Sequence, residues 1–306
     1  MDENLAVFIA STLRLAMPLI LAAAGELVSE RAGVLNLSLE GMMLTAAFFG
    51  ALGSWATGSP VLGILCAVLA SFVVSVVQAV LSVHWRANQL VVGIGFNILA
   101  LGATTLLYRI IFGGLSREEI PGLAKLAIPG VSDLPFIGPA LLQQSVLVYF
   151  GLACVVLIWW MLKSTAFGLS IRAVGDDPRA ADKAGIPVAR IRFQAVLIAG
   201  VMAGLAGSFL SVADINTFTE NMTNGAGYLA IAAVIFGGWT VWRTLGACLL
   251  FGAATALQFQ LPAIGIEMPT ALLLMLPYLL ALLAVAGVVG RRDPPTALTL
   301  PFIRGK

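Results

Sequence analysis

The chain has 306 residues, of which 60% are hydrophobic and only 10% are charged. An average soluble domain carries about 25% charged residues, so this composition excludes a soluble globular fold and indicates an integral membrane protein. The net charge of +2 gives no sign of a nucleic-acid partner. The acidic start, MDENLAVFIA, lacks the basic region of a cleaved signal peptide, so the first apolar run is expected to stay in the mature protein.

Nine apolar runs follow one another along the chain. A spanning helix needs about 20 mainly apolar residues. The seventh run is short and rich in glycine, so a count of eight or ten spans stays open. We predict an all-α, polytopic transmembrane bundle of about nine helices in a single domain, 1–306. The runs are 5–25, 36–56, 60–83, 90–112, 144–163, 193–213, 225–242, 244–261 and 269–290.

Basic residues gather in alternate connections, which predicts the orientation in the membrane. With the N-terminus outside, 13 of the 17 basic residues fall on the cytoplasmic side, and the outer side holds Arg109, Arg117 and Lys125. The bias predicts an external N-terminus and a cytoplasmic C-terminus. The connections would then be a short cytoplasmic segment at 26–35, an external loop at 113–143, a cytoplasmic loop at 164–192, and a Pro-broken cytoplasmic tail, 291–306, expected to be mobile.

Two stretches of the chain echo each other weakly. AGELVS (24–29) and AGSFLS (206–211) each lead through polar residues to a glycine and then to Phe-Gly. They follow spans that would run in opposite directions, which is the pattern of an inverted repeat. Aligning them needs a gap of about five residues, so a chance similarity stays open as the alternative.

The cytoplasmic loop at 164–192 carries start and stop signals for a short helix. Asp177 is a good N-cap, Pro178 suits the first helical position, and Gly185 suits the position after the last turn. A plain connector would not need these signals, so we interpret the segment as a docking element for a soluble partner. The residues assigned to this role are Asp177, Pro178, Arg179, Ala181, Asp182, Lys183 and Gly185.

Three separated stretches resemble the permease subunits of bacterial ABC importers. They are SERAGVLNLSLEGMML (29–44), AVGDDPRAADKAGIPVARIR (173–192) and GYLAIAAVIFGGW (227–239). The resemblance covers roughly residues 5 to 290. ERAGVLNLSLEGMM is most similar to the nucleoside branch, which is related to permeases for simple sugars and branched-chain amino acids.

The resemblance implies a multi-pass protein of the bacterial inner membrane that works with three kinds of partner. A second homologous permease would complete the pathway, an extracytoplasmic binding protein would deliver solute, and a cytoplasmic ATPase would dock on 164–192. The chain itself has no G-x-x-x-x-G-K-[ST] phosphate-binding loop, so it is not expected to be an enzyme or to bind a cofactor. ATP and magnesium would bind to the partner ATPase.

Polar residues inside the apolar runs are the candidates for the solute pathway. A carboxylate at Glu40 is costly to bury and would face a water-filled path; on an extended entry segment Asn36, Ser38 and Glu40 could point the same way. The alternative is that Glu40 pairs with Arg31 or Arg14 to hold the bundle together.

Phe96 and Asn97 are further candidates. The ring of Phe96 could stack on the base of a nucleoside, and the amide of Asn97 could bond the polar edge of the base. Asn97 could instead bond a neighbouring helix. Thr223 and Asn224 are second candidates, with an ordinary external turn as the alternative.

Other function classes find less support. An ion-coupled secondary transporter should carry an ionisable relay in several spans, and here Glu40 and Arg14 are the main candidates. The cysteines, Cys66, Cys154 and Cys248, lie in separate apolar runs, so neither a metal site nor a disulfide is expected. Gly200 and Gly204 form a G-x-x-x-G pair that predicts a close helix contact.

Overall fold

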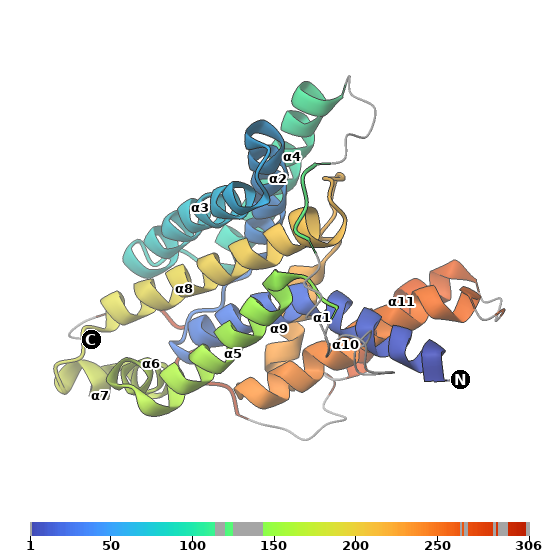
Figure 1. The fold of residues 1–306 in the computed structure, drawn as a ribbon. Coiled ribbons are helices and arrows are strands. Elements are labelled where there is room, and N and C mark those ends of the chain that lie inside the picture. Colours follow the sequence, from blue (N-terminus) through green and yellow to red (C-terminus); the bar gives the residue numbers. More distant parts are fainter. Residues whose placement is uncertain are drawn as a thin grey trace.

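The computed structural model describes residues 2–113, 120–124, 143–263, 265, 269–283, 286 and 293–303. Within these ranges the regular elements are helices, in agreement with the predicted fold class (Figure 1). They are α1 (Asp2–Arg31), α2 (Leu39–Thr57), α3 (Pro60–Ala79), η1 (Val80–His84), α4 (Gln89–Phe112), α5 (Val146–Ser164), α6 (Ala166–Asp176), α7 (Pro178–Lys183), α8 (Val188–Ser208), η3 (Phe209–Asp214), α9 (Ala226–Phe236), α10 (Val241–Ala263) and α11 (Thr270–Leu283).

Within the described residues, six helices are long and apolar enough to cross a membrane. They comprise α1, α3 continued by η1, α4, α5, α8 continued by η3, and α10. The 19 residues of α2 form a further, mostly buried helix. The described part of α11 has 14 residues, which is shorter than the predicted run at 269–290.

The predicted seventh span is wrong in its extent. α9 has 11 residues and ends at Phe236, and α10 begins at Val241 rather than at 244. At 1.5 Å per residue α9 covers about 16 Å, roughly half of a hydrocarbon core of about 30 Å. A turn at 237–240, containing Gly237 and Gly238, separates the two helices, and the continuous apolar composition concealed it. The count of nine spans therefore stays a prediction.

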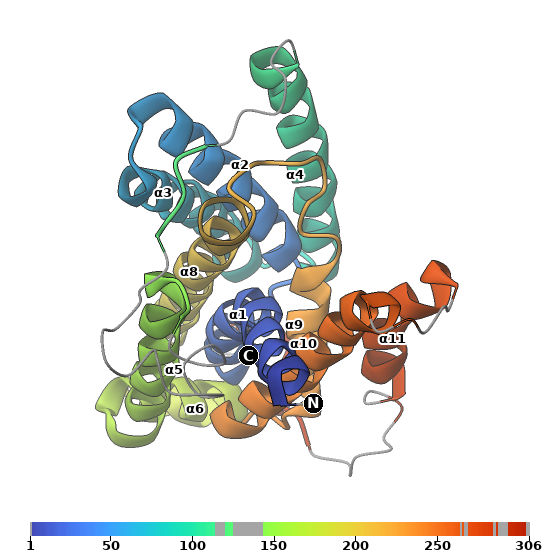
Figure 2. The same ribbon diagram turned by 45° about the vertical axis from the view of Figure 1, so that its right-hand side comes forward.

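Helices α1 and α8 form the centre of the bundle. Figure 2 shows α1 surrounded by α5, α8, α9 and α10, and α1 packs against each of these. The apolar window of α8 is 78% buried, whereas that of α4 is 17% buried, so α4 lies at the periphery. In Figure 1 α1 and α8 run in opposite directions, as the inverted-repeat interpretation requires, although the repeat itself stays a prediction.

Small residues permit the close packing of α8. A Cβ at Gly200 would lie 2.2 Å from Ser75 Cβ, and one at Gly204 would lie 2.7 Å from Val68 Cα. The Ser71 hydroxyl donates to the Gly200 carbonyl at 2.7 Å. The close contact predicted from the G-x-x-x-G pair is thus confirmed between α8 and α3.

The segment 26–35, predicted as a connection between two spans, is helical as far as Arg31. The turn that follows is largely buried. Glu26 and Glu30 have no exposed surface. The predicted apolar run, 5–25, ends where the polar residues begin, but the helix continues for six more residues, to Arg31.

Most of the loop at 113–143, which we predicted to be external, lies outside the described residues, including Arg117 and Lys125. The described piece 120–124 packs on the bundle: the Ile120 amide donates to the Asn216 carbonyl at 3.1 Å, and the Ser54 hydroxyl donates to the Pro121 carbonyl at 2.6 Å. In the tail, 291–292 and 304–306 also lie outside the described residues.

Candidate functional site

The Glu40 carboxylate connects the start of α2 to the start of α9. Its Oε1 accepts hydrogen bonds from the Thr223 hydroxyl at 2.6 Å and the Gly225 amide at 2.8 Å, and its Oε2 accepts one from the Gly227 amide at 2.6 Å. Only 7% of Glu40 is exposed. Three donors and the positive end of α9 stabilise the buried charge. Glycine is required at 227, because a Cβ there would lie 2.6 Å from the Glu40 amide nitrogen.

The predicted alternative, in which Glu40 pairs with an arginine, is wrong. Arg14 Nε lies 3.4 Å from Asp214 Oδ1. Arg31 donates from Nε to the Trp239 carbonyl at 2.8 Å. Glu40 therefore acts as the acceptor for the loop that precedes α9.

Asn97 joins α4 to the same region. Its Oδ1 accepts a hydrogen bond from the Gly41 amide at 2.8 Å, and its Nδ2 donates to the Leu37 carbonyl at 2.8 Å and to the Tyr228 hydroxyl oxygen at 2.7 Å. The interpretation of Asn97 as a bond between helices is confirmed. Phe96, the preceding residue on α4, is half-buried.

Aromatic side chains with exposed surface surround this polar cluster. Tyr228 is 45% exposed and Tyr278 is 43% exposed. Tyr278 donates its hydroxyl to the carbonyl of Asn224 at 2.6 Å. The structure thus brings together Glu40, Asn97, Thr223 and Asn224 from our candidates, and adds two tyrosines that sequence reasoning missed because α9 and α11 meet only in the fold.

Asn36 and Ser38 are placed differently from Glu40. Both are fully buried, and the Ser38 hydroxyl donates to Asn36 Oδ1 at 2.6 Å. The Asn36 amide donates to Glu26 Oε1 at 2.8 Å. In this conformation the two residues support the turn between α1 and α2, and their role in a pathway stays a prediction.

Two buried carboxyl groups escaped the sequence reasoning. Glu30 Oε2 accepts a hydrogen bond from Trp239 Nε1 at 2.6 Å, and Glu26 lies one turn earlier on α1. Glu26 Oε2 and Glu30 Oε1 have no hydrogen-bond partner within the described ranges. The four-residue spacing was visible in the sequence and would have placed them on one helix face.

The short helix predicted at 178–184 is present as α7. Asp177 Oδ1 accepts hydrogen bonds from the amides of Arg179 at 2.9 Å and Ala180 at 3.0 Å, and Pro178 is the first helical residue. Gly185 ends the helix at φ +85°, with its amide bonded to the Asp182 carbonyl.

The side chains of α7 divide between the core and the surface. Arg179, Ala180 and Lys183 are exposed, whereas Ala181 is only 4% exposed. Asp182 is half-buried and lines a cavity of about 640 Å³ with His84. Ala181 therefore belongs to the core of this chain rather than to its surface.

The tail does not behave as predicted, because its described part packs beside α7. Arg192 Nη1 donates to the Leu300 carbonyl at 2.7 Å and Nε donates to the Ala32 carbonyl at 3.1 Å. The Ala297 amide donates to the Gly175 carbonyl at 2.9 Å. These bonds join distant segments, so no local signal revealed them. The tail, α6 and α7 enclose a cavity of about 430 Å³.

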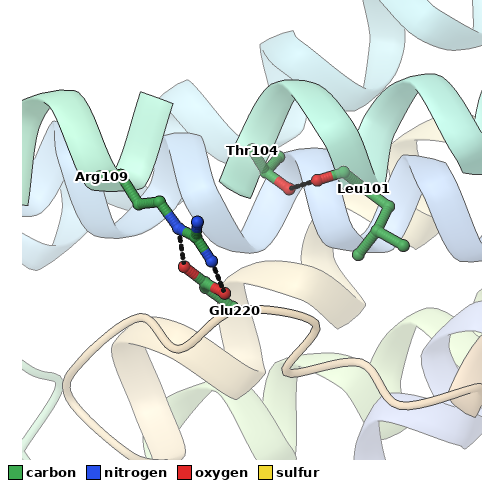
Figure 3. Close-up of polar contacts among 4 residues, drawn as sticks. All are labelled: Leu101, Thr104, Arg109 and Glu220. Atoms are coloured by element: carbon green, nitrogen blue, oxygen red, sulfur yellow. Dashed lines mark hydrogen bonds and ion pairs between the residues drawn. The ribbon is translucent and has the colours of Figure 1, made fainter. Parts of the chain in front are cut away.

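At the other end of the bundle, α4 holds the loop that carries Thr223 and Asn224. Figure 3 shows Arg109 reaching from α4 to Glu220, with Nε 2.7 Å from Oε1 and Nη2 3.1 Å from Oε2. This contact lowers the pKa of Glu220, chiefly through the hydrogen bond from Arg109. The bidentate geometry fixes the loop relative to α4.

Comparisons with known proteins agree with this architecture. The profile of the family described as the permease component of branched-chain amino acid transport systems matches residues 8–285. The guanosine ABC transporter permease protein NupQ of Bacillus subtilis is 38% identical, over 99% of this chain and 98% of its own length. The nucleoside ABC transporter permease protein NupC of Lactococcus lactis is 32% identical, over 99% of both chains.

The description of a third relative names a different substrate. The Haloferax volcanii protein TsgC13, described provisionally as a glucose ABC transporter permease, is 37% identical over 84% of this chain and 78% of its own length. No solved structure matches the chain.

Proposed function

The chain belongs to the permease family of branched-chain amino acid transport systems, and from this premise we propose that it is the membrane-spanning permease of an ATP-driven nucleoside importer. Two relatives that match over 99% of the chain are described as guanosine and nucleoside permeases. This similarity is the reason for proposing a nucleoside as the substrate. The polar cluster of Glu40 and Asn97 suits this substrate, because amide and carboxylate groups can bond a base edge or a ribose.

Aromatic surface beside the cluster suits a nucleobase. Phe96, Tyr228 and Tyr278 offer partly exposed rings near Asn97 and Asn224, and every base has a face that can stack on such a ring. The Tyr228 oxygen already accepts a bond from Asn97, so its own hydroxyl hydrogen can be donated to a solute. Thr223 and Asn224 would line the path from the same loop.

Energy for transport would come from a partner ATPase. α7 and the tail line one cavity, and Arg192 of α8 bonds both the tail and Ala32 after α1, so a movement of this region could pass to α1 and α8. A cytoplasmic ATPase with ATP and magnesium, a second homologous permease and an extracytoplasmic binding protein would complete the importer. In this proposal the N-terminus is outside and the tail is inside, as the basic residues predict. The packing of the tail at the far end of α1, a helix of about 45 Å, supports opposite sides for the two.

A sugar permease is the second candidate, favoured by the similarity to the Haloferax volcanii protein. A path for sugars needs hydrogen-bonding groups but gains less from aromatic stacking. A permease for branched-chain amino acids would need partners for a carboxylate and an ammonium. Nucleosides and sugars therefore predict different effects of removing the Phe96 ring on uptake.

Uptake in a strain that lacks the gene would test the substrate. We expect restored uptake of purine and pyrimidine nucleosides, with no competition from pentoses. Phe96→Ala should lower uptake of both kinds of nucleoside by about 3- to 10-fold, while Phe150→Ala, which removes an exposed ring on α5, should not. Asn97→Ala should lower the rate more than the apparent affinity, because the binding protein sets affinity outside. Full competition by pentoses, with uptake insensitive to Phe96→Ala, would overturn the nucleoside proposal in favour of sugars.

A further inference from the structure

A third cavity opens where the last turn of α5 meets the start of α10. It has a volume of about 450 Å³ and is separate from the Glu40 and Asn97 cluster. α6 contributes Arg172 to it, so the cavity lies at the same end of the bundle as α7. Its lining consists of Arg31, Trp159, Leu162, Lys163, Arg172, Trp239, Thr240, Val241, Trp242 and Arg243.

The lining is strongly basic. Four of its side chains are cationic and none is a carboxylate. The ion pairs Arg14–Asp214 and Arg109–Glu220 do not involve these cations. Arg172 Nε is buried and has no hydrogen-bond partner within that part. Asp176 acts on Arg31 from outside the lining, so the cations still outnumber the nearby carboxylates and the cavity favours an anion.

Three tryptophans distinguish this cavity from an ordinary basic groove. The rings of Trp159 and Trp242 lie 5.8 Å apart, and Lys163 Nζ lies 5.0 Å from the centre of the Trp159 ring. Tryptophan is enriched where a membrane meets water, because its ring is apolar and its N–H is polar. The exposed ring of Trp242, beside that of Trp159, thus favours a position for the cavity at the depth of lipid headgroups.

Exposed apolar side chains lead along the helices to the cations. On α5, Val156, Trp160 and Lys163 occupy one face at helical spacing, with Val156 48% and Trp160 52% exposed. On α10, Trp242 and Leu250 are exposed in the same way. A lysine at the end of an apolar stripe suits a molecule with acyl chains and a charged head.

We propose that this cavity binds the phosphate headgroup of an anionic phospholipid, with its acyl chains against the exposed faces of α5 and α10. Lys163 and Arg243 are exposed and would contact the phosphate from two sides, while Arg172 supplies a donor from α6. Basic pockets between spanning helices hold such headgroups by the same combination of charge and shape. The bound lipid would join α5, α6 and α10 next to α7.

Native mass spectrometry of the full chain, purified in detergent and titrated with lipid, tests this site. We expect phosphatidylglycerol to bind more tightly than phosphatidylcholine. The double variant Lys163→Gln/Arg243→Gln should weaken phosphatidylglycerol binding by about 10- to 30-fold, since each basic side chain near a headgroup contributes about 1 kcal/mol. The variant should stay monodisperse, because both side chains are exposed.

A matched control separates a specific site from general charge. Arg86→Gln/Arg190→Gln removes two exposed cations from the cavity that contains His84 and Asp182, and should leave phosphatidylglycerol binding within twofold. Equal binding of the two lipids, or equal loss in both double variants, would overturn the proposal. Displacement of the lipid by millimolar inorganic phosphate would identify a free phosphate site instead. Unchanged lipid binding with loss of the co-purified ATPase would identify a protein interface.

Discussion

At the scale of single residues, the contact between Arg109 and Glu220 makes the stability of the loop before α9 depend on pH. Because the contact lowers the pKa of Glu220, its stabilising effect is present above the ordinary titration range of glutamate. The effect is lost as the pH falls through the lowered pKa. Both side chains are exposed, so salt should also weaken the contact.

Hydrogen–deuterium exchange of residues 215–225 would measure this dependence. After correction for intrinsic rates, we expect protection that is constant near neutral pH and falls in acid below the normal range of glutamate. The Glu220→Gln variant should show, at every pH, the low protection that the unmodified chain shows in acid. Unchanged protection in the variant would mean that Glu40, rather than Arg109, holds the loop alone.

At the scale of elements, the start and the end of α7 could both be predicted from the sequence. Its cap, its first proline and its final glycine all lie within nine residues, so local chemistry determines it. Ala181 is the exception. Its burial depends on neighbouring helices, and an aspartate there would disturb this chain instead of a docking surface.

A charge on the exposed side of α7 makes a sharper test of coupling. We expect Ala180→Asp to reduce the stimulation of the partner ATPase by the loaded binding protein by about 10-fold, while the subunit reaches the membrane at normal levels. Ser164→Asp adds the same charge at the exposed end of α5 and should leave stimulation intact. Normal stimulation by the Ala180→Asp complex would show that α7 is a connector.

At the scale of the whole molecule, the orientation proposed from basic residues is open to direct measurement. In a background without Cys66, Cys154 and Cys248, a membrane-impermeant thiol reagent should label Thr57→Cys in intact cells. It should label Ala180→Cys only after the membrane is opened. Both positions are exposed, so accessibility depends on the side of the membrane alone. The opposite pattern would invert the orientation and remove α7 from the cytoplasm.

Much of the fold was predictable from the sequence, because apolar length identifies helices that lie in lipid. The polar cluster was predictable only in part. Glu40 and Asn97 stand out in apolar runs, whereas Tyr278 joins them only because α11 packs near Asn224. The bond between Glu30 and Trp239 joins residues 209 positions apart, and no pattern along the chain indicates it. The end of a short helix such as α9 is missed for a related reason, since apolar composition continues through the turn that follows it.

The hydrogen bonds of Arg192 to the tail bear on how the protein is made. Leu300 lies 108 positions after Arg192, so these bonds can form only when synthesis has continued well beyond α8. The surface beside α7 is therefore unfinished on a nascent chain, even after every spanning helix has entered the membrane. A prematurely terminated product would carry its helices but not this surface. The segment around Leu300 must therefore be made before the surface beside α7 can receive a partner.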